Sequence, residues 1–287
     1  MTNDIELLFA CKKNTPGMLF DFIKTIKNRE MRTNSQWTIQ FLQEKYNQNQ
    51  IWIRIETDIA IVLFRDTENI LRLTYFSRDE KTLSLLNSII PVVDSPVVCD
   101  LLGKEPTVTE RAAELTHIGL KPYAQYKRMI CTELQNFDES LDLTAVETAK
   151  EEDIEEIFTM LHDEFDVITA RMPGKEIIRQ RIKDKDVFVI RQNKTIGGFI
   201  VFDSCSKKNA LLEYVMVRPE LRNMHIAKKI WNYKLRFANA SKYYFLWVNM
   251  ARKTAIKFHQ SNGYHFDGLV DNIFLVPKSL KEESRNG

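Results

Sequence analysis

The same order of alternating strands occurs twice in this chain, and this repeat limits the folds that the chain can adopt. Residues 51–76 and 187–217 each contain three short β-rich segments separated by turn residues, which predicts an antiparallel three-stranded meander in each half. After each meander, apolar spacing predicts a helix, a strand and a second helix that ends near a glycine, in HIGL and in SNGY. Two related α/β domains are therefore expected. Chance similarity between two mixed α/β halves is the alternative.

The sequence between the two repeats indicates where the domains part. Residues 136–141 (NFDESL) are polar and interrupt the apolar pattern, which is typical of a linker. We therefore expect one domain over residues 1–137 and a second over residues 142–287. An independent helical-plus-sheet module is the alternative for the first half.

Composition and residue spacing exclude several classes of protein. Lys and Arg number 41 and Asp and Glu 39, which leaves a formal charge of +2, so no bulk charge draws the chain to nucleic acid or anionic lipid. The longest apolar runs are far shorter than the roughly 20 residues of a membrane-spanning helix. The four cysteines have no CxxC spacing and the histidines do not cluster, so no metal site is indicated. We expect a cytoplasmic protein that needs no metal and acts on no membrane. Association with nucleic acid is a further alternative, against which the near-neutral charge and the absence of a dense basic stretch argue.

The segment LLEYVMVRPELRNMHIAKKI carries the clearest chemical signal in the chain. An apolar strand leads to Pro219, an arginine, a short polar turn and a predicted helix. This order brings several backbone N–H groups and the positive end of a helix to one point. A phosphate group is the ligand that such a point favours.

This stretch resembles the acyl-CoA signature of the GNAT superfamily of N-acyltransferases, whose loop runs Gln or Arg, two residues of any kind, Gly, any residue, and Gly or Ala. Residues 222–227 align with that loop, with His225 in place of its first glycine, and Val217 and Pro219 precede it. The resemblance covers roughly residues 142–277, and the downstream pattern is similar at Ala255, Phe258, His259, Gly263 and Tyr264. It implies an α/β fold with two GNAT-like domains, each a mostly antiparallel mixed sheet with one splayed parallel strand pair and flanking helices. The first half has no arginine-to-glycine loop and resembles a degenerate, shortened copy that cannot hold a diphosphate.

The resemblance implies an acyl-CoA-dependent N-acyltransferase that uses acetyl-CoA as cosubstrate. The acceptor would be a primary amine of a small molecule or peptide, which attacks the thioester directly. A catalytically impaired CoA-binding or interaction module is the alternative. The residues implied to bind the cofactor follow the third strand of the meander, the loop with the first helical turn, and the next strand: Val215, Met216, Val217, Arg222, Asn223, Met224, His225, Ile226, Ala227, Lys228, Asn249 and Arg252.

Two residues are candidates for proton transfer. Strand alternation places Glu213 on the same face as Val215 and Val217, where its carboxylate would accept the amine proton directly or through water. His259 occupies the position of the tyrosine that family members often use to protonate the departing thiolate, and histidine can serve as an acid. A strand-edge glutamate and a helix histidine without function are the alternatives.

Overall fold

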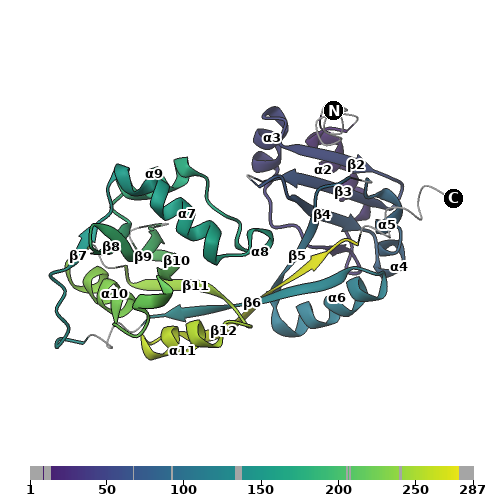
Figure 1. Cartoon of the computed structure of the whole chain (residues 1–287). Coiled ribbons are helices and arrows are strands. Elements are labelled where there is room, and N and C mark those ends of the chain that lie inside the picture. The colour runs from purple at the N-terminus through teal and green to yellow at the C-terminus, as the bar shows by residue number, and fades with distance from the viewer. Residues whose placement is uncertain are drawn as a thin grey trace. The chain divides into compact units, whose positions relative to one another are not determined.

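The computed structural model describes residues 9, 14–66, 68–91, 93–132, 138–204, 206, 208–238 and 241–277. These residues form a mixed α/β fold (Figure 1), divided into two compact units. Unit 1 comprises Met1–Gln125 and Val270–Gly287, and unit 2 comprises Tyr126–Leu269. The units do not follow the division at residues 138–141, because strands β6 (Lys121–Cys131) and β12 (His265–Leu275) each contribute residues to both. The assignment of one sequence repeat to residues 1–137 and the other to residues 142–287 stays a prediction. Residues 133–137 lie outside the part of the chain that the structure describes.

Unit 1 contains the meander predicted over residues 51–76. Strands β2, β3 and β4 pair in antiparallel order, and β4 pairs in parallel with β5, which neighbours β12. The continuous apolar run of β3 is buried on both faces, as expected for a central strand: Ile59 and Ile61 belong to one core cluster and Ala60 and Val62 to another. The strands are β1 (Arg32–Thr33), β2 (Ile51–Ile55), β3 (Ile59–Arg65), β4 (Leu71–Ser77) and β5 (Val97–Lys104), and the helices are α2 (Pro16–Ile26), α3 (Ile39–Asn47), α4 (Glu80–Leu83), α5 (Leu86–Ile89) and α6 (Glu105–His117).

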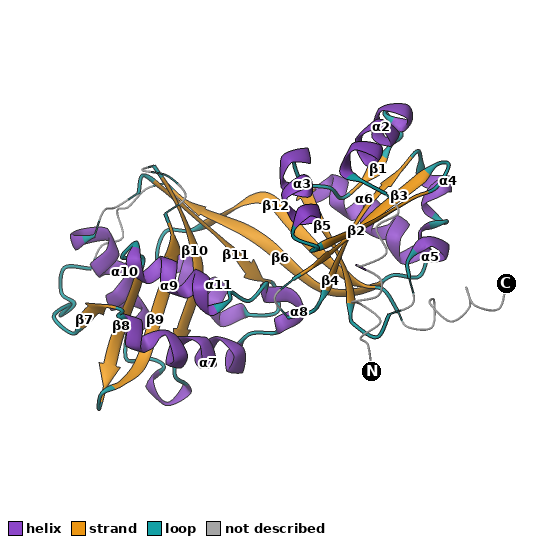
Figure 2. Cartoon of the chain, turned by 90° about the horizontal axis from the view of Figure 1, so that it is seen from above, coloured by secondary structure: helices purple, strands orange, loops and turns teal. Residues whose placement is uncertain are grey.

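Unit 2 contains the second meander in the strand order β6-β11-β10-β9-β8-β7. Its helices lie on both sides of these strands (Figure 2). Alternate residues of β9 show the two faces, because Phe199 packs in the cluster with α7 and α9, whereas Ile200 packs in the cluster with α10. The strands are β7 (Val146–Thr148), β8 (Val187–Gln192), β9 (Thr195–Asp203), β10 (Asn209–Val217) and β11 (Tyr243–Asn249), and the α-helices are α7 (Ile154–Glu164), α8 (Val167–Ala170), α9 (Lys175–Lys183), α10 (Ile226–Phe237) and α11 (Lys253–Ser261).

A β-bulge in β10 changes which side chains share a face. The register of β10 against β9 shifts between Leu212 and Tyr214, which leaves Glu213 as the extra residue. Val215 therefore packs against the α10 cluster, while Glu213 bonds to Arg181 of α9 on the opposite side. The expectation that Glu213 shares a face with Val215 and Val217 is wrong, because simple alternation does not account for an inserted residue.

None of the helices in the described ranges is both long and apolar enough to span a bilayer.

Candidate functional site

The parallel strand pair of unit 2 diverges toward its C-terminal end. β10 and β11 pair at three positions only, from Asn209 with Tyr243 to Leu211 with Phe245. Beyond that point β11 pairs with β6 on its other side, and no strand in the described chain pairs with residues 212–217 on the side of β11. Backbone groups along this edge of β10 thus have no partner strand; at its end Arg222 Nε donates to the carbonyl oxygen of Val217 at 3.4 Å. An extended ligand that carries amide groups can bind such an edge as an added strand.

The turn that follows β10 has left-handed backbone at two of its residues. Asn223 and His225 both have left-handed backbone, with φ values of 71° and 57°, and turns of this kind direct successive N–H groups toward one point. His225 is the N-cap of α10 and makes no side-chain capping bond, so the first N–H groups of this 12-residue helix have no acceptor within it. The turn and the positive helix end together favour an anion.

His225 replaces the glycine of the family loop without changing the turn. Its φ of 57° lies in the region that glycine adopts most easily. A non-glycine residue there costs roughly 1 kcal/mol of backbone strain. A Cβ at this position therefore adds strain but is compatible with this backbone conformation.

Two glycines of β9 keep α10 close to the sheet. A Cβ atom on Gly198 would lie 2.7 Å from Cγ2 of Ile226 and 2.9 Å from the carbonyl oxygen of Met216, and one on Gly197 would lie 2.8 Å from Cδ1 of Leu221. The close approach places the start of α10 beside the end of β10. Neither glycine was among the predicted site residues, although adjacent glycines within a predicted strand indicate close backbone contact.

Two arginines that follow the diverging strands meet at one carboxylate. Arg222 Nη2 lies 3.1 Å from Oε2 of Glu164, and Arg252 Nη1 lies 3.1 Å from its Oε1. Arg252 Nη2 also donates to the main-chain oxygen of Glu164, at 3.1 Å. Exposed ion pairs of this kind contribute little to stability, so a phosphate group can displace the carboxylate. The structure brings together the two arginines predicted for anion binding, and it adds Glu164, which no sequence motif indicated.

The remaining predicted cofactor residues have varied surroundings. Lys228 Nζ is paired with Oδ2 of Asp138 at 2.9 Å, and Asn249 Oδ1 accepts the N–H of Ala251 at 2.9 Å, so both side chains stabilise local structure. Met216 and Ile226 are buried, Val215, Val217 and Ala227 are half-buried, and Asn223, Met224 and His225 are exposed. For most of these residues the backbone, rather than the side chain, is therefore the group able to contact a ligand.

Glu213 is held in a two-bond ion pair within unit 2. Its Oε2 lies 3.0 Å from Nε of Arg181 and its Oε1 lies 3.2 Å from Nη2 of the same residue. Arg181 Nη2 also donates to Asp203 at 2.5 Å. Both oxygens of the Glu213 carboxylate are therefore engaged by one guanidinium group. Whether Glu213 takes part in catalysis stays a prediction.

His259 is buried on α11 and packs edge-on against the ring of Tyr264, with 5.6 Å between ring centroids. Burial lowers the pKa of His259 to about 4, because desolvation disfavours the charged imidazolium. At neutral pH the ring is therefore uncharged. Its Nδ1 atom is buried without a hydrogen-bond partner in the described structure. A catalytic role for His259 also stays a prediction.

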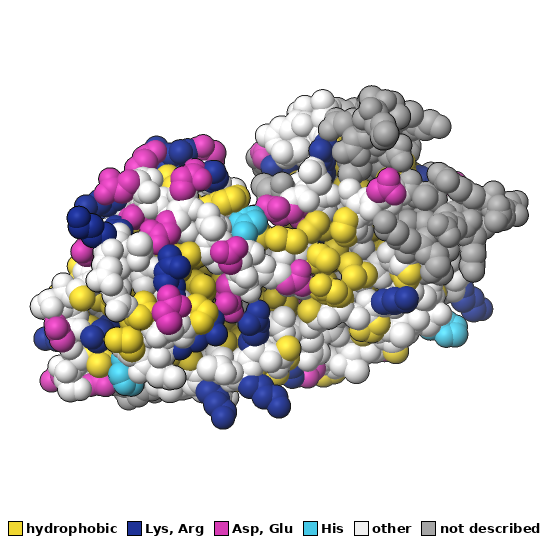
Figure 3. Space-filling model, viewed as in Figure 1, with side chains coloured by type: hydrophobic (Ala, Val, Ile, Leu, Met, Phe, Trp, Pro, Cys, Tyr) yellow, Lys and Arg dark blue, Asp and Glu magenta, His cyan; other side chains and the backbone are white. Residues whose placement is uncertain are grey.

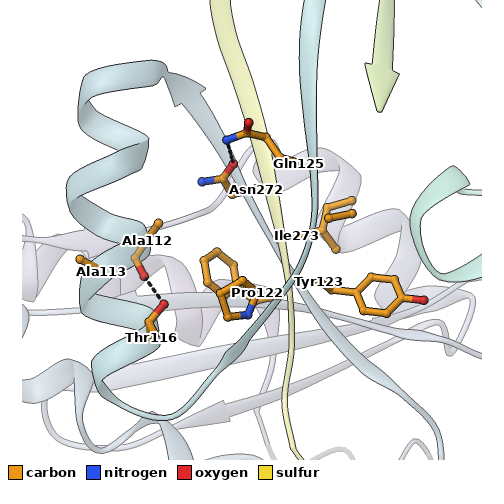
Figure 4. Close-up of a pocket in the computed structure, with 10 residues that line it drawn as sticks. Ala112, Ala113, Thr116, Pro122, Tyr123, Gln125, Asn272 and Ile273 are labelled. Carbon is orange, nitrogen blue, oxygen red and sulfur yellow. Dashed lines mark hydrogen bonds between the residues drawn. The ribbon is translucent and has the colours of Figure 1, made fainter. Parts of the chain in front are cut away.

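Unit 1 has a separate surface pocket of about 420 Å³ between α6, β6 and β12 (Figure 4). Gln125 donates to Asn272 at 2.9 Å and Thr116 donates to the carbonyl of Ala112 in its own helix at 2.8 Å. Hydrophobic side chains gather over β5 and β12 on the face shown in Figure 3. The pocket is lined by no Asp, Glu, His, Lys, Arg or Cys residue, and none of the predicted site residues contributes to it. The diverging strands of unit 2 thus remain the better candidate site.

The described part of the chain contains no group of three or more His, Cys, Asp or Glu residues able to hold a metal ion.

The family comparison agrees with the geometry of unit 2. Residues 147–264 match the family described as Acetyltransferase (GNAT) family. This segment is a GNAT domain. It includes the β10 edge, the turn at residues 222–225 and α11. No curated protein matches the chain.

Solved structures extend the GNAT likeness to both units. The chain is similar to the GCN5-related N-acetyltransferase from Sphaerobacter thermophilus, with a TM-score of 0.55, 12% identity and coverage of 85% of this chain and 86% of that chain. A tandem GNAT protein from the clavulanic acid biosynthesis pathway gives a TM-score of 0.52 and 10% identity over 96% of this chain and 93% of that one. The GCN5-related N-acetyltransferase from Kribbella flavida gives 0.50 and 10%, over 82% and 93%. At these identities the likeness shows the fold alone, and the expected tandem of two GNAT-like α/β folds is confirmed.

Proposed function

We propose that the GNAT domain transfers an acyl group, acetyl in the simplest case, from acyl-CoA to a primary amine of a small molecule or peptide. One observation carries this proposal: the free edge of β10 leads directly into the N–H-lined turn at the start of α10. Pantetheine amides suit the edge, and a diphosphate suits the turn. Arg222 and Arg252 supply positive charge beside them.

The proposed reaction is a direct attack on the thioester. The nitrogen of a neutral amine forms a bond to the acyl carbon, the carbon–sulfur bond breaks, the amine loses one proton and the CoA thiolate gains one. A backbone N–H on the free edge of β10 would stabilise the oxyanion of the tetrahedral intermediate. We assign the amine proton to Glu213 through water, since Arg181 holds both carboxylate oxygens. The thiolate takes its proton from water, because the His259 imidazole is uncharged at neutral pH and an uncharged imidazole is a very weak acid.

A CoA-binding module without turnover is the second candidate function. Two observations favour this function. Glu213 is in an ion pair with Arg181, and His259 is buried and uncharged at neutral pH. Such a protein would still bind CoA through the edge of β10 and through the turn at residues 222–225, which we call the anion turn. Both bind through backbone groups and need no acid–base side chain.

Thiol release and cofactor binding separate the two functions. We expect calorimetry to detect acetyl-CoA binding, and a panel of primary amines to include one that accelerates thiol release. Glu213→Gln should lower kcat, whereas Glu147→Gln should not; Glu147 is a matched control because it is also a strand glutamate paired with an arginine, at 3.2 Å. Binding without any amine-dependent thiol release would favour the module. Absence of acetyl-CoA binding would contradict both functions.

A further inference from the structure

The parallel strand pair of unit 1 diverges in the same way as that of unit 2. β4 and β5 pair at two positions only, Leu71 with Val97 and Arg72 with Val98. If unit 1 matched unit 2, the edge of β4 after Arg72 would be open to a ligand. In unit 1, however, the chain itself occupies this edge.

The side chain of Asn34 lies between the two diverging strands. Its Nδ2 donates to the carbonyl oxygens of Leu73 in β4 and Asp100 in β5, both at 2.9 Å. Its Oδ1 accepts the backbone N–H of Tyr75 at 2.9 Å. One carboxamide thus bonds to main-chain groups of both strands, which is the hydrogen-bonding pattern that an amide of an inserted ligand would provide.

The residues next to Asn34 complete the same edge. Strand β1 pairs antiparallel with the end of β4, Arg32 with Ser77 and Thr33 with Phe76. The free edge of β4 is therefore covered in turn by β5, by the Asn34 carboxamide and by β1. In the described chain no strand and no carboxamide covers the corresponding edge of β10, where Arg222 Nε donates to the carbonyl oxygen of Val217 at 3.4 Å.

Side-chain bonds fix this segment in place. Trp37 Nε1 donates to Oγ1 of Thr74 on β4 at 3.2 Å, and Arg111 of α6 donates to the carbonyl of Thr33 at 3.0 Å. Arg32 Nε bonds to Glu114 at 3.0 Å. These bonds come from two different elements, β4 and α6, and all of them lie in unit 1. The segment is thus part of the packed structure of the unit.

A negative group follows the C-terminal end of β4 in unit 1. Asp79 caps α4, and its Oδ1 accepts the N–H of Thr82 at 2.8 Å. Hydrogen bonding from the backbone of Thr82 lowers the pKa of Asp79 below its usual value, so the carboxylate is charged at neutral pH. An anion such as a diphosphate would be repelled at the place where unit 2 offers free N–H groups.

We infer that residues 32–37 occupy in unit 1 the place that acyl-CoA takes in unit 2, with the Asn34 carboxamide acting as a built-in substitute for a pantetheine amide, so that each chain binds one acyl-CoA. The stoichiometry rests on the function proposed for unit 2. The occupation of the β4 edge in unit 1 does not rest on that function, because it follows from the contacts of Asn34 and β1.

Binding stoichiometry tests the inference with CoA itself. Native mass spectrometry and calorimetry of the full chain should give one CoA per chain, and Arg222→Glu in unit 2 should weaken binding at least tenfold with no second site left behind. Two CoA molecules per chain, or one that still binds with unchanged affinity in Arg222→Glu, would overturn the inference.

Hydrogen exchange gives a test that needs no CoA, so failure of the proposed function can be distinguished from failure of this inference. In Asn34→Ala the amide of Tyr75 loses its acceptor, and its exchange rate should rise about tenfold or more, as expected from removal of buried hydrogen bonds. The buried Cys99 thiol, 3.4 Å from Asn34 Nδ2, should become more reactive toward a maleimide, located by peptide mass spectrometry. The control Asn28→Ala alters the same loop at an exposed bond to Arg78 and should change neither readout.

Equal exchange of Tyr75 in the two variants would overturn the inference. If Asn34→Ala does not fold, hydrogen exchange of the Tyr75 amide in the wild-type protein tests the inference instead. Protection of the Tyr75 amide at the level of its β4 neighbours supports the inference, and exchange as fast as that of exposed loop amides contradicts it.

Discussion

Replacement of Glu164 by glutamine should tighten CoA binding. In the structure this carboxylate is 3.1 Å from both Arg222 and Arg252, so it occupies the two guanidinium groups that a phosphate of CoA would need. Glu164→Gln keeps the size of the side chain and its ability to accept a hydrogen bond. It removes only the negative charge that competes with the ligand.

The size of the effect follows from Coulomb's law. A phosphate bound to the same guanidinium groups would lie about 5 Å from the carboxylate, and at an effective dielectric constant of about 60 the repulsion is about 1 kcal/mol per phosphate charge. Because about 1.4 kcal/mol corresponds to a factor of ten, we expect the Kd for CoA to fall roughly three- to tenfold. High salt screens partly exposed charges, so the effect should shrink at about 0.5 M salt.

Calorimetry with CoA and with pantetheine measures this prediction directly. Pantetheine lacks the phosphates, so its affinity should be the same in wild type and Glu164→Gln. The control Glu155→Gln removes an equal charge from the same helix, where Glu155 pairs with Lys175 at 2.6 Å and with neither arginine; it should alter CoA affinity much less. Weaker CoA binding in Glu164→Gln would show that the carboxylate positions the arginines for the ligand, and the reasoning would be refuted. An equal gain in Glu155→Gln would also refute it.

Three further predictions concern the glycine contact, the turn and the buried histidine. Gly198→Ala should lower the free energy of unfolding by about 1–3 kcal/mol, because its Cβ would overlap Ile226. Urea denaturation measures this free energy, with Gly17→Ala as the control, because the atom nearest to a Cβ there is 3.7 Å away. Equal stability of the two variants would contradict the prediction. His225→Gly should bind CoA at least as tightly as wild type and His225→Val less tightly, because a β-branched residue resists positive φ. Weaker CoA binding by His225→Gly than by wild type in calorimetry would contradict this and show that the imidazole contacts the ligand. The pKa of His259 is lowered to about 4, so the folded protein binds fewer protons than the unfolded chain between about pH 4 and 6.5, and stability should fall with decreasing pH across that window by at most about 1.4 kcal/mol per unit. His259→Gln should flatten this dependence in urea titrations, and an unchanged slope would assign it to other groups.

Much of the candidate site could be predicted from a short stretch of sequence. The anion turn at residues 222–225 is encoded locally, because a strand, a short polar turn and a helix start follow one another directly in the chain. The meanders of both halves are encoded in the same way, by alternation and turn residues. These features depend on residues within a few positions of each other, where spacing alone decides geometry.

The β-bulge at Glu213 shows where the local pattern fails. Strand alternation assigns each residue from 209 to 217 to one face of the sheet. One inserted residue changes the faces that residues before the bulge share with residues after it. The bulge arises from the pairing of β10 with β9, and no property of β10 alone specifies that pairing. The partner of Glu213, Arg181, lies 32 positions away in the sequence.

The sequence by itself determined the two meanders, the helices and strands that follow them, and the position of the turn at residues 222–225 that we propose binds a diphosphate. Only the tertiary structure decided which side chains meet there. Glu164 joins arginines that are 58 and 88 positions away, and Asn34 bonds to Asp100, 66 positions away. Local periodicity carries no information about such distant pairs, because they form only when separate helices and strands pack against one another.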